Sequence, residues 1–184
     1  GEYEDGAEVT VTAEENEGWY FMGWYDATTS ILLAEDYEYT FQALGDVNLI
    51  AYFIPALEGM ATDLVIGANT LTASAVLSIG TLNMNLVLGE EEEGAYWLAE
   101  TTTLSIDGNE ATLLEGMAAV NPETQMAAAE MLVMYNEALY YIGVLMVAPE
   151  TGVDNIQVEN VAVKMIKNGQ LIIKQNGREF NVQG

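Results

Sequence analysis

Apolar and polar residues alternate with a period of two along much of this chain, and no other feature constrains its fold as strongly. In residues 81–88 every even position is Leu or Met, and residues 9–12 and 103–106 alternate in the same way. Successive side chains of a β-strand point to opposite faces, so each segment predicts a strand with one buried face. Asp107-Gly108 then provides a typical hairpin turn. We therefore expect a mostly-β fold.

The C-terminal residues give the clearest prediction of topology. Two Asn-Gly pairs, Asn168-Gly169 and Asn176-Gly177, separate three short runs at Val161–Lys167, Leu171–Gln175 and Arg178–Val182. Asn-Gly readily adopts the positive φ angles of a two-residue type I′ turn. The sequence therefore predicts a three-stranded antiparallel meander.

Residues 123–139 fit two structures. They are rich in Ala, Met, Glu and Leu, which are good helix formers, but a helix would place Glu130 on the same face as Met126, Val133 and Met134. The alternative is a β-hairpin that turns at Asn136-Glu137. We favour the hairpin, because its returning arm is aromatic and β-branched over its full length.

That returning arm, Leu139–Val147, is apolar on both faces. A strand of this kind has to be covered on both sides, and a domain of residues 57–149 covers only one. The second side is then left for the N-terminal module, the C-terminal tail or a neighbouring chain. The residues that we single out as a candidate interaction surface are Tyr140, Ile142, Val144 and Met146.

Prolines divide the chain into three parts. Pro55 and Pro149 each follow an apolar run and predict strand ends that open into linkers, whereas Pro122 marks a loop. The expected domains are residues 1–56, 57–149 and 150–184. The middle part holds six to eight strand-like runs and suits an antiparallel β-sandwich or small barrel. The chain begins with Gly1 and has no apolar run of about 18 residues, so we expect a processed product without direct membrane insertion.

Charge is segregated along the chain. Of 29 acidic residues, 28 lie in residues 1–163, which hold no base, and residues 164–184 carry a net charge of +3. A surface this acidic repels phosphate backbones and anionic lipids, so we expect no nucleic-acid partner. The basic tail either docks against the acidic body or is read by another molecule, and the local Asn-Gly turns favour the second interpretation. Its bases are Lys164, Lys167, Lys174 and Arg178.

The residue types of the chain argue against a catalytic site or a metal site. The chain has no histidine and no cysteine, which excludes Ser-His-Asp and Cys-His pairs, the usual zinc sites and disulfides. Glu90–Glu93 is interpreted as a solvated hairpin tip, because four adjacent like charges splay apart. Paired carboxylates of a glycosidase cannot be singled out among 29 acids. We expect no catalytic residue, metal or cofactor.

The N-terminal part resembles a known family. The pattern comprises Asp5-Gly6, Val9–Ala13, Gly18–Trp24, Tyr39–Phe41 and Asp46–Phe53. It is similar to one copy of the Listeria–Bacteroides repeat, also called the internalin B-type B-repeat, whose members are β-grasp-like modules of bacterial secreted and surface proteins. This resemblance implies a non-catalytic module. Its expected aromatic core comprises Trp19, Phe21, Trp24, Phe41 and Phe53.

The C-terminal part resembles a second element. A linker at Thr151–Ile156 precedes a basic strand, an Asn-Gly turn, an apolar strand and the final Asn176–Gly184 segment. This order is similar to the C-terminal sorting tails of proteins exported by the Bacteroidetes-type (type IX, or Por) secretion system. The resemblance implies export to the cell surface.

Together these features predict a secreted or outer-surface protein that acts in adhesion, spacing or surface assembly and is not an enzyme. The expected partners are other surface proteins or further copies of the chain. The alternative is a small-ligand or glycan-binding module centred on residues 57–149, in which Tyr96, Trp97, Tyr140 and Tyr141 would stack on sugar rings.

Overall fold

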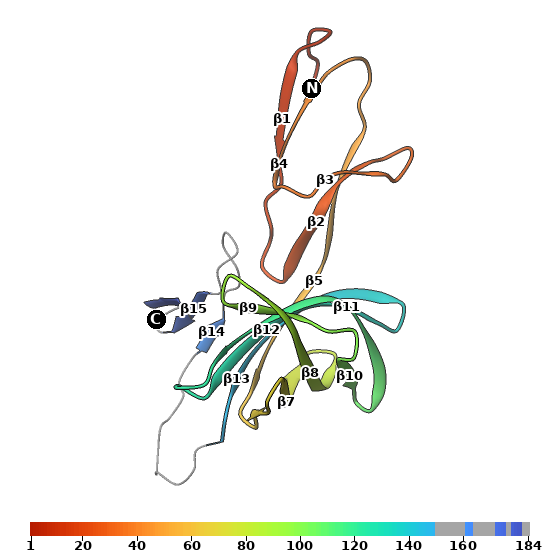
Figure 1. Cartoon of the computed structure of the whole chain (residues 1–184). Coiled ribbons are helices and arrows are strands. Elements are labelled where there is room, and N and C mark those ends of the chain that lie inside the picture. The colour runs from red at the N-terminus through yellow and green to blue at the C-terminus, as the bar shows by residue number, and fades with distance from the viewer. Residues whose placement is uncertain (150–160, 164–171, 176–177, 182–184) are drawn as a thin grey trace. The chain divides into compact units, whose positions relative to one another are not determined.

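The computed structural model describes residues 1–149, 161–163, 172–175 and 178–181, and the chain divides into two compact units, Gly1–Ala56 and Leu57–Gly184. Every regular element in these described ranges is a β-strand (Figure 1). The prediction of a mostly-β fold is confirmed, and residues 123–139 form the favoured hairpin rather than a helix. Within the same ranges there is no helix of the length and hydrophobicity needed to cross a membrane.

The first unit is built from two small antiparallel pieces of sheet. One is the ribbon of β1 (Glu8–Thr12) and β4 (Glu38–Gln42). In the other, β2 (Trp19–Asp26) pairs with β3 (Leu32–Ala34) on one side and with β5 (Leu49–Ala61) on the other. The ribbon and the sheet enclose an aromatic core around Phe21 and Trp24.

A β-bulge in β2 allows both core aromatics to point the same way. Phe21 pairs with Phe53, and the register then shifts so that Gly23 pairs with Tyr52. Residues three apart would lie on opposite faces of a regular strand, and the extra residue returns Trp24 to the core side. Gly23 suits this position because its φ is +134°, in a region that other residues rarely adopt.

The expected strand end at Pro55 is wrong, because β5 continues through it to Ala61. Pro55 pairs with Trp19 at the first residue of β2, and the next backbone nitrogen, that of Ala56, donates to the oxygen of Gly18 at 2.9 Å. Proline is tolerated in a strand where its nitrogen does not have to donate to the ladder. β5 therefore begins in the first unit and ends in the second.

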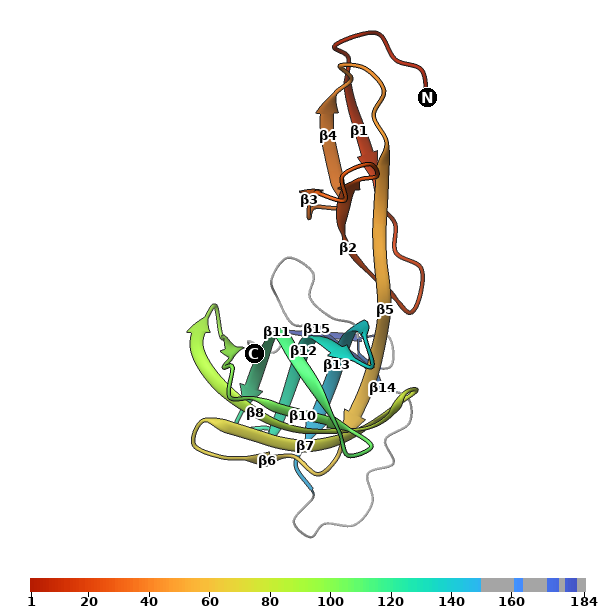
Figure 2. The same ribbon diagram turned by 90° about the vertical axis from the view of Figure 1, so that its right-hand side faces the viewer.

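The main sheet of the second unit is curled and antiparallel, with the strand order β5-β13-β12-β11-β10-β8-β7-β6, and β9 pairs with both β8 and β11. Figure 2 shows β11, β12 and β13 side by side, with β7, β8 and β10 forming a second layer. The strands are β6 (Val65–Ile66), β7 (Thr70–Leu77), β8 (Gly80–Glu92), β9 (Ala95–Leu98), β10 (Thr103–Ile106), β11 (Asn109–Asn121), β12 (Met126–Tyr135) and β13 (Ala138–Val147).

The inward sides of these two layers share one hydrophobic core, to which each strand contributes alternate residues. The buried members of this core are aliphatic. Its most deeply buried members include Leu71, Leu82, Leu86, Ile106, Met131, Val133, Ile142, Val144 and Met146.

Tight turns join the long hairpins at the predicted places. Asn136 and Glu137 have φ of 49° and 63°, and Asp107 and Gly108 have φ of 49° and 81°. Positive φ at both central residues is the signature of the type I′ turn, whose twist matches that of the strands. Pro122 lies, as predicted, in the turn between β11 and β12.

The predicted C-terminal meander is present as β14 (Val161–Val163), β15 (Ile172–Gln175) and β16 (Arg178–Asn181), paired antiparallel in that order. Both Asn-Gly turns and the predicted linker at Thr151–Ile156 lie outside the described residues.

Candidate functional site

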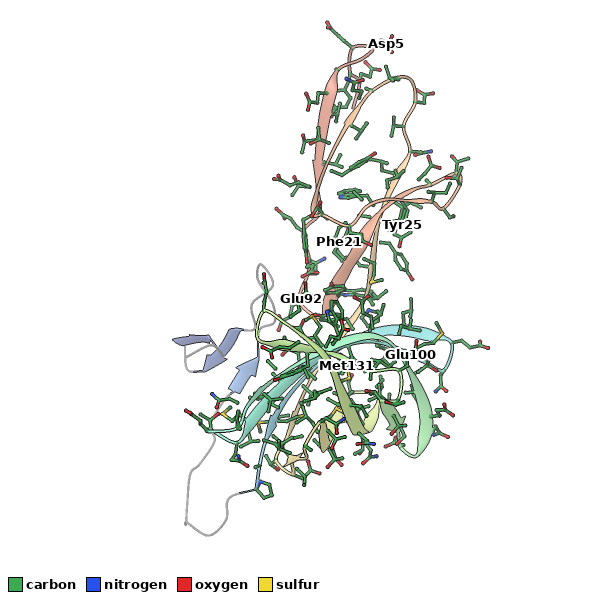
Figure 3. The ribbon with its side chains drawn as sticks, in the orientation of Figure 1. Asp5, Phe21, Tyr25, Glu92, Glu100 and Met131 are labelled. Atoms are coloured by element: carbon green, nitrogen blue, oxygen red, sulfur yellow. The ribbon has the colours of Figure 1, made fainter. Side chains whose placement is uncertain are left out.

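The first unit has an apolar sheet face that is not used for its core, and we call it the open face. It is the side of the β2–β3–β5 sheet opposite Phe21 and Trp24. The register places Tyr25 beside Leu32 on one side and beside Ile50 on the other. Figure 3 shows Phe21 and Tyr25 on opposite sides of β2. The residues that we assign to the open face are Tyr25, Leu32, Ile50 and Tyr52.

These side chains form a continuous and exposed apolar patch. The rings of Tyr25 and Tyr52 meet edge to face, with centroids 5.9 Å apart and planes at 80°. Ile50 is 48% exposed and Tyr52 is 44% exposed. Leu32 lies over Gly23, where an added Cβ would come within 2.6 Å of its Cδ1. Contiguous exposed apolar patches are a feature of interaction surfaces, so this face is the candidate site.

Local hydrogen bonds hold the loops that border the sheet. Asp26 ends β2 and accepts hydrogen bonds from the backbone nitrogens of Thr28 and Thr29, at 2.9 and 2.7 Å. The bonds from Thr29 and then Thr28 lower the pKa of Asp26 below its ordinary value. Asp26 thereby fixes the turn into β3 and the position of Leu32.

On the core side, the carboxylate of Glu15 accepts hydrogen bonds from the backbone nitrogen of Phe21 and from the hydroxyl of Tyr37, each at 2.7 Å. Partial burial, followed by the hydrogen bond and charge of Glu15, raises the pKa of Tyr37 above its ordinary value. These contacts tie the loop after β1 to both β2 and the start of β4. Hydrogen bonds therefore connect the sheet that carries the open face to the neighbouring loop.

All charged side chains of the first unit, which carries the open face, are acidic. Residues 1–56 contain 12 acidic residues and no base. An apolar centre in an acidic unit suits a partner that combines an apolar centre with basic groups around it. A second copy of the same unit would bring like charge to the contact.

Of the predicted aromatic core, Phe21 and Trp24 are buried, and Phe53 packs against them half-buried. Phe41 is half-buried and stacks on Tyr39, with centroids 5.5 Å apart. The placement of Trp19 in the core is wrong, because this side chain is 48% exposed. Trp19 is the first residue of β2 and directly follows the turn at Gly18, so it lies at the end of the sheet.

The candidate surface of Tyr140, Ile142, Val144 and Met146 also needs correction. Ile142, Val144 and Met146 are completely buried, and Tyr140 is partly buried against the same core. Both faces of β13 are apolar, so the alternation of residue types along this strand does not distinguish the inward face from the outward one. These four residues are part of the interior of the second unit and not a surface.

The acidic run lies at the tip of the hairpin between β8 and β9. Glu90, Glu91, Glu92 and Glu93 are exposed, and the indole nitrogen of Trp97 donates to Glu92 Oε2 at 2.8 Å. Across the part of the chain that the structure describes, no cluster of acidic residues is arranged to hold a metal ion. Lys164 and Lys167 lie outside that part, while Lys174 belongs to β15 and Arg178 to β16.

The open face was missed at the sequence level, although a signal for it exists. In Leu49–Ile54 all six residues are apolar, so β5 has two apolar faces. Leu49, Ala51 and Phe53 pack in the core, and the intervening Ile50 and Tyr52 are exposed. A continuous apolar run in so small a module thus indicates a second apolar face.

Residues 1–56 match the family model of a divergent InlB B-repeat domain. Repeats of this family are typical of bacterial surface and secreted proteins. No curated protein is significantly similar to the chain, and no solved structure is significantly similar to it.

Proposed function

We propose that this protein is a non-catalytic surface module of bacteria that acts in adhesion, spacing or surface assembly, and that it holds a partner protein on the open face. The observation that carries the proposal is the exposed patch of Tyr25, Leu32, Ile50 and Tyr52, in a unit similar to a surface-protein repeat. Aromatic and aliphatic side chains on a rigid sheet supply contact area at low entropic cost.

The charge of the first unit limits the class of partner protein that can bind to the open face. Because residues 1–56 carry 12 acids and no base, like charges disfavour a second copy of the unit. The partner that fits is another surface protein with an apolar patch bordered by Lys or Arg. Such a complex forms faster at low ionic strength, since opposite charges steer the encounter.

The experiment compares full-length chains that differ only on this face. Beads coated with the wild-type chain, the Ile50→Ser/Tyr52→Ser variant or the Val76→Ser variant are mixed with cells of the source bacterium from which the gene has been deleted. Val76 is the matched control, because it is 76% exposed and lies on β7 of the second unit. We expect the double variant to lose attachment at least about tenfold and the control to retain it.

Attachment that is equal for all three chains would exclude the open face as the binding site. Loss of attachment with the Val76→Ser variant as well would show that general surface hydrophobicity, and not this face, drives adhesion. Circular dichroism of each variant establishes that the changes leave the fold intact.

Export through the type IX route is part of the same proposal and is supported by the resemblance of residues 150–184 to sorting tails. Residues 150–184 are fused to a reporter protein and expressed in a bacterium that has this secretion system. Reporter on the cell surface supports the proposal, and reporter retained in the periplasm contradicts it. Attachment through the open face is measured independently of this result.

The alternative is a small-ligand or glycan-binding module centred on residues 57–149. Its core residues Leu71, Leu82 and Met131 are fully buried, whereas the exposed apolar patch described above lies on the first unit. We therefore place the binding function on the first unit.

A further inference from the structure

Among the residues that the structure describes, β1 and β4 form a sheet of their own, so this ribbon of the first unit has unpaired edges. At one end of the ribbon the backbone nitrogen of Ala13 donates to the oxygen of Tyr37 at 2.8 Å. At the other end the backbone nitrogen of Ala43 donates to the oxygen of Ala7 at 2.9 Å. Hydrogen-bonded pairs alternate with pairs that are not hydrogen-bonded along an antiparallel ladder, so every second residue of β4 turns its backbone groups away from β1. These residues are Glu38, Thr40 and Gln42, and we call this side of the ribbon the β4 edge.

The β4 edge lacks the features that usually keep an edge strand from pairing. Proline, lysine, β-bulges and very short strands serve this purpose in many sheets. β4 has five residues with the sequence EYTFQ, and its register with β1 runs without a shift. Figure 2 shows β4 on the outer side of the ribbon, away from β5. The backbone of this edge is therefore open to another strand.

Apolar area borders the β4 edge as well. The rings of Tyr39 and Phe41 stack with centroids 5.5 Å apart, and both side chains are only half-buried. Val9, which pairs with Phe41 from the other strand of the ribbon, is 5% exposed. β4 thus has aromatic surface left to bury, and we place the contact on this strand and not on β1.

The sequence of β4 is complementary to itself when two copies run antiparallel. A two-fold axis at Thr40 places Thr40 opposite Thr40 of the second copy and Tyr39 opposite Phe41. The same axis places Glu38 opposite Gln42, so the acidic side chain meets a neutral amide and not another acid. Cross-strand pairs of two aromatic residues or of two threonines stabilise an antiparallel sheet.

We propose that two copies of this chain pair antiparallel through their β4 edges, centred on Thr40, which joins the two ribbons into one sheet. The outward backbone groups of Glu38, Thr40 and Gln42 form the hydrogen-bonded pairs of the new ladder. The oxygen of Gln42 also accepts the backbone nitrogen of Leu44 at 3.0 Å, and a carbonyl oxygen has two lone pairs and can accept a second hydrogen bond. Because each copy uses the same patch, the contact closes as a dimer.

Charge opposes this pairing at long range but not at the contact itself. Each copy has a formal net charge of −25, so two copies repel each other. Salt screens this repulsion, whereas the backbone hydrogen bonds and the aromatic contacts do not depend on it. We therefore expect the dimer to strengthen as the ionic strength rises, which is opposite to the dependence expected for a basic partner on the open face. The pairing does not depend on the open face, which lies on the other sheet of the unit.

Cysteine cross-linking of the full-length chain tests both the pairing and its register, because the chain has no cysteine of its own. Directly opposite, hydrogen-bonded residues have Cα atoms about 5.5 Å apart, within the range that a disulfide spans. Thr10→Cys is the matched control for Thr40→Cys, since Thr10 faces Thr40 across the ribbon and their hydroxyls share one hydrogen bond of 2.8 Å. In the dimer the two Thr10 positions lie three strand spacings apart, about 14 Å, which a disulfide does not reach.

Under mild oxidation at high salt, we expect Thr40→Cys to form disulfide-linked dimers at least about tenfold faster than Thr10→Cys. Equal rates for the two variants would overturn the proposal. A wild-type chain that sediments as a monomer at every salt concentration would overturn it too. Slow hydrogen exchange of the Thr40 amide in such a monomer would show that another part of the same chain covers the β4 edge.

Substitutions at Gln42 test the same register without a covalent bond. Gln42→Glu sets two acids opposite each other, and Gln42→Lys sets opposite charges at the same place. By analytical ultracentrifugation we expect the dimer to be about tenfold weaker in the first variant and about tenfold stronger in the second. Val76→Lys, at a position that is 76% exposed on β7, controls for the change in net charge and should dimerise like the wild type. Equal effects of Gln42→Lys and Val76→Lys would contradict this register.

The open-face variant Ile50→Ser/Tyr52→Ser separates the two proposals. We expect it to dimerise like the wild type, whatever its effect on attachment to cells. Loss of the dimer in this variant, with Gln42→Glu still dimeric, would move the contact between copies to the open face and overturn the pairing through β4.

Discussion

Replacing Trp24 by alanine should unfold the first unit and leave the second intact. Trp24 is 8% exposed and packs edge to face on Phe21, with ring centroids 5.8 Å apart. Its indole nitrogen donates to the backbone oxygen of Tyr37 at 3.3 Å. That oxygen also accepts the backbone nitrogen of Ala13 at 2.8 Å, so it stays hydrogen-bonded in the variant. The main cost is therefore lost packing.

The expected magnitude is comparable to the whole stability of the unit. Removing a buried tryptophan side chain costs about 3–5 kcal/mol. Domains are stable by about 0.05–0.15 kcal/mol per residue, which for a unit of this length is about 3–8 kcal/mol. The core around Trp24 shares no buried residue with that of the second unit, so only the first unit should be affected.

Hydrogen exchange with mass spectrometry on the full chain measures each unit separately. In Trp24→Ala we expect peptides from residues 1–56 to lose protection and those from residues 57–149 to keep it. The matched control is Trp19→Ala, which removes an equally large side chain that is 48% exposed and should cost less than about 1 kcal/mol. Full protection of residues 1–56 in Trp24→Ala, or equal losses in both variants, would refute the assignment of the core.

Three further outcomes follow from the structure. Glu137→Gly should raise the free energy of unfolding of the second unit by about 1 kcal/mol in urea titrations, because Glu137 holds a φ of 63° that glycine adopts without strain. Gly116→Ala should lower the same quantity by about 1–3 kcal/mol, since its Cβ would lie 2.9 Å from both the backbone oxygen of Glu130 and Leu98 Cδ1. Tyr37 has a raised pKa in the folded unit, so the stability that its neutral form contributes is complete below about pH 10 and lost as the pH rises further. Melting curves of the full chain between about pH 9 and 12 should therefore fall more steeply for the wild type than for Tyr37→Phe.

The strands and hairpins of this fold were predictable because their signals are local. Alternation over residues 81–88 gives β8, and the turn at Asn136-Glu137 is found where predicted. Asparagine tolerates positive φ, so the residues of the turn themselves favour its conformation. The meander follows from the same chemistry of Asn-Gly pairs.

The predictions that were wrong concern features that depend on long-range packing. Pro55 predicted a strand end, yet its nitrogen occupies a position in β5 where no donor is required. Trp19 was predicted to belong to the core, but the core lies farther along the sheet, around Phe21 and Trp24. Periodicity identifies the two faces of β13, and only the curl of the whole sheet decides that Ile142 points inward and Leu145 outward. The open face was not predicted, because its residues are of the apolar types that usually form a core.

The two units differ in the residues that form the second apolar face of their strands. Each contains strands with two apolar faces, and in each unit one of these faces forms the core. In the first unit the second face carries Tyr25 and Tyr52, whose amphipathic rings tolerate water and still offer contact area when a partner binds. In the second unit the second face is built from Ala128, Gly143 and the fully covered Leu145, which suit permanent close packing. Residue type thus distinguishes an exposed apolar face, which carries amphipathic aromatic side chains, from a buried one, which is built from small residues and leucine.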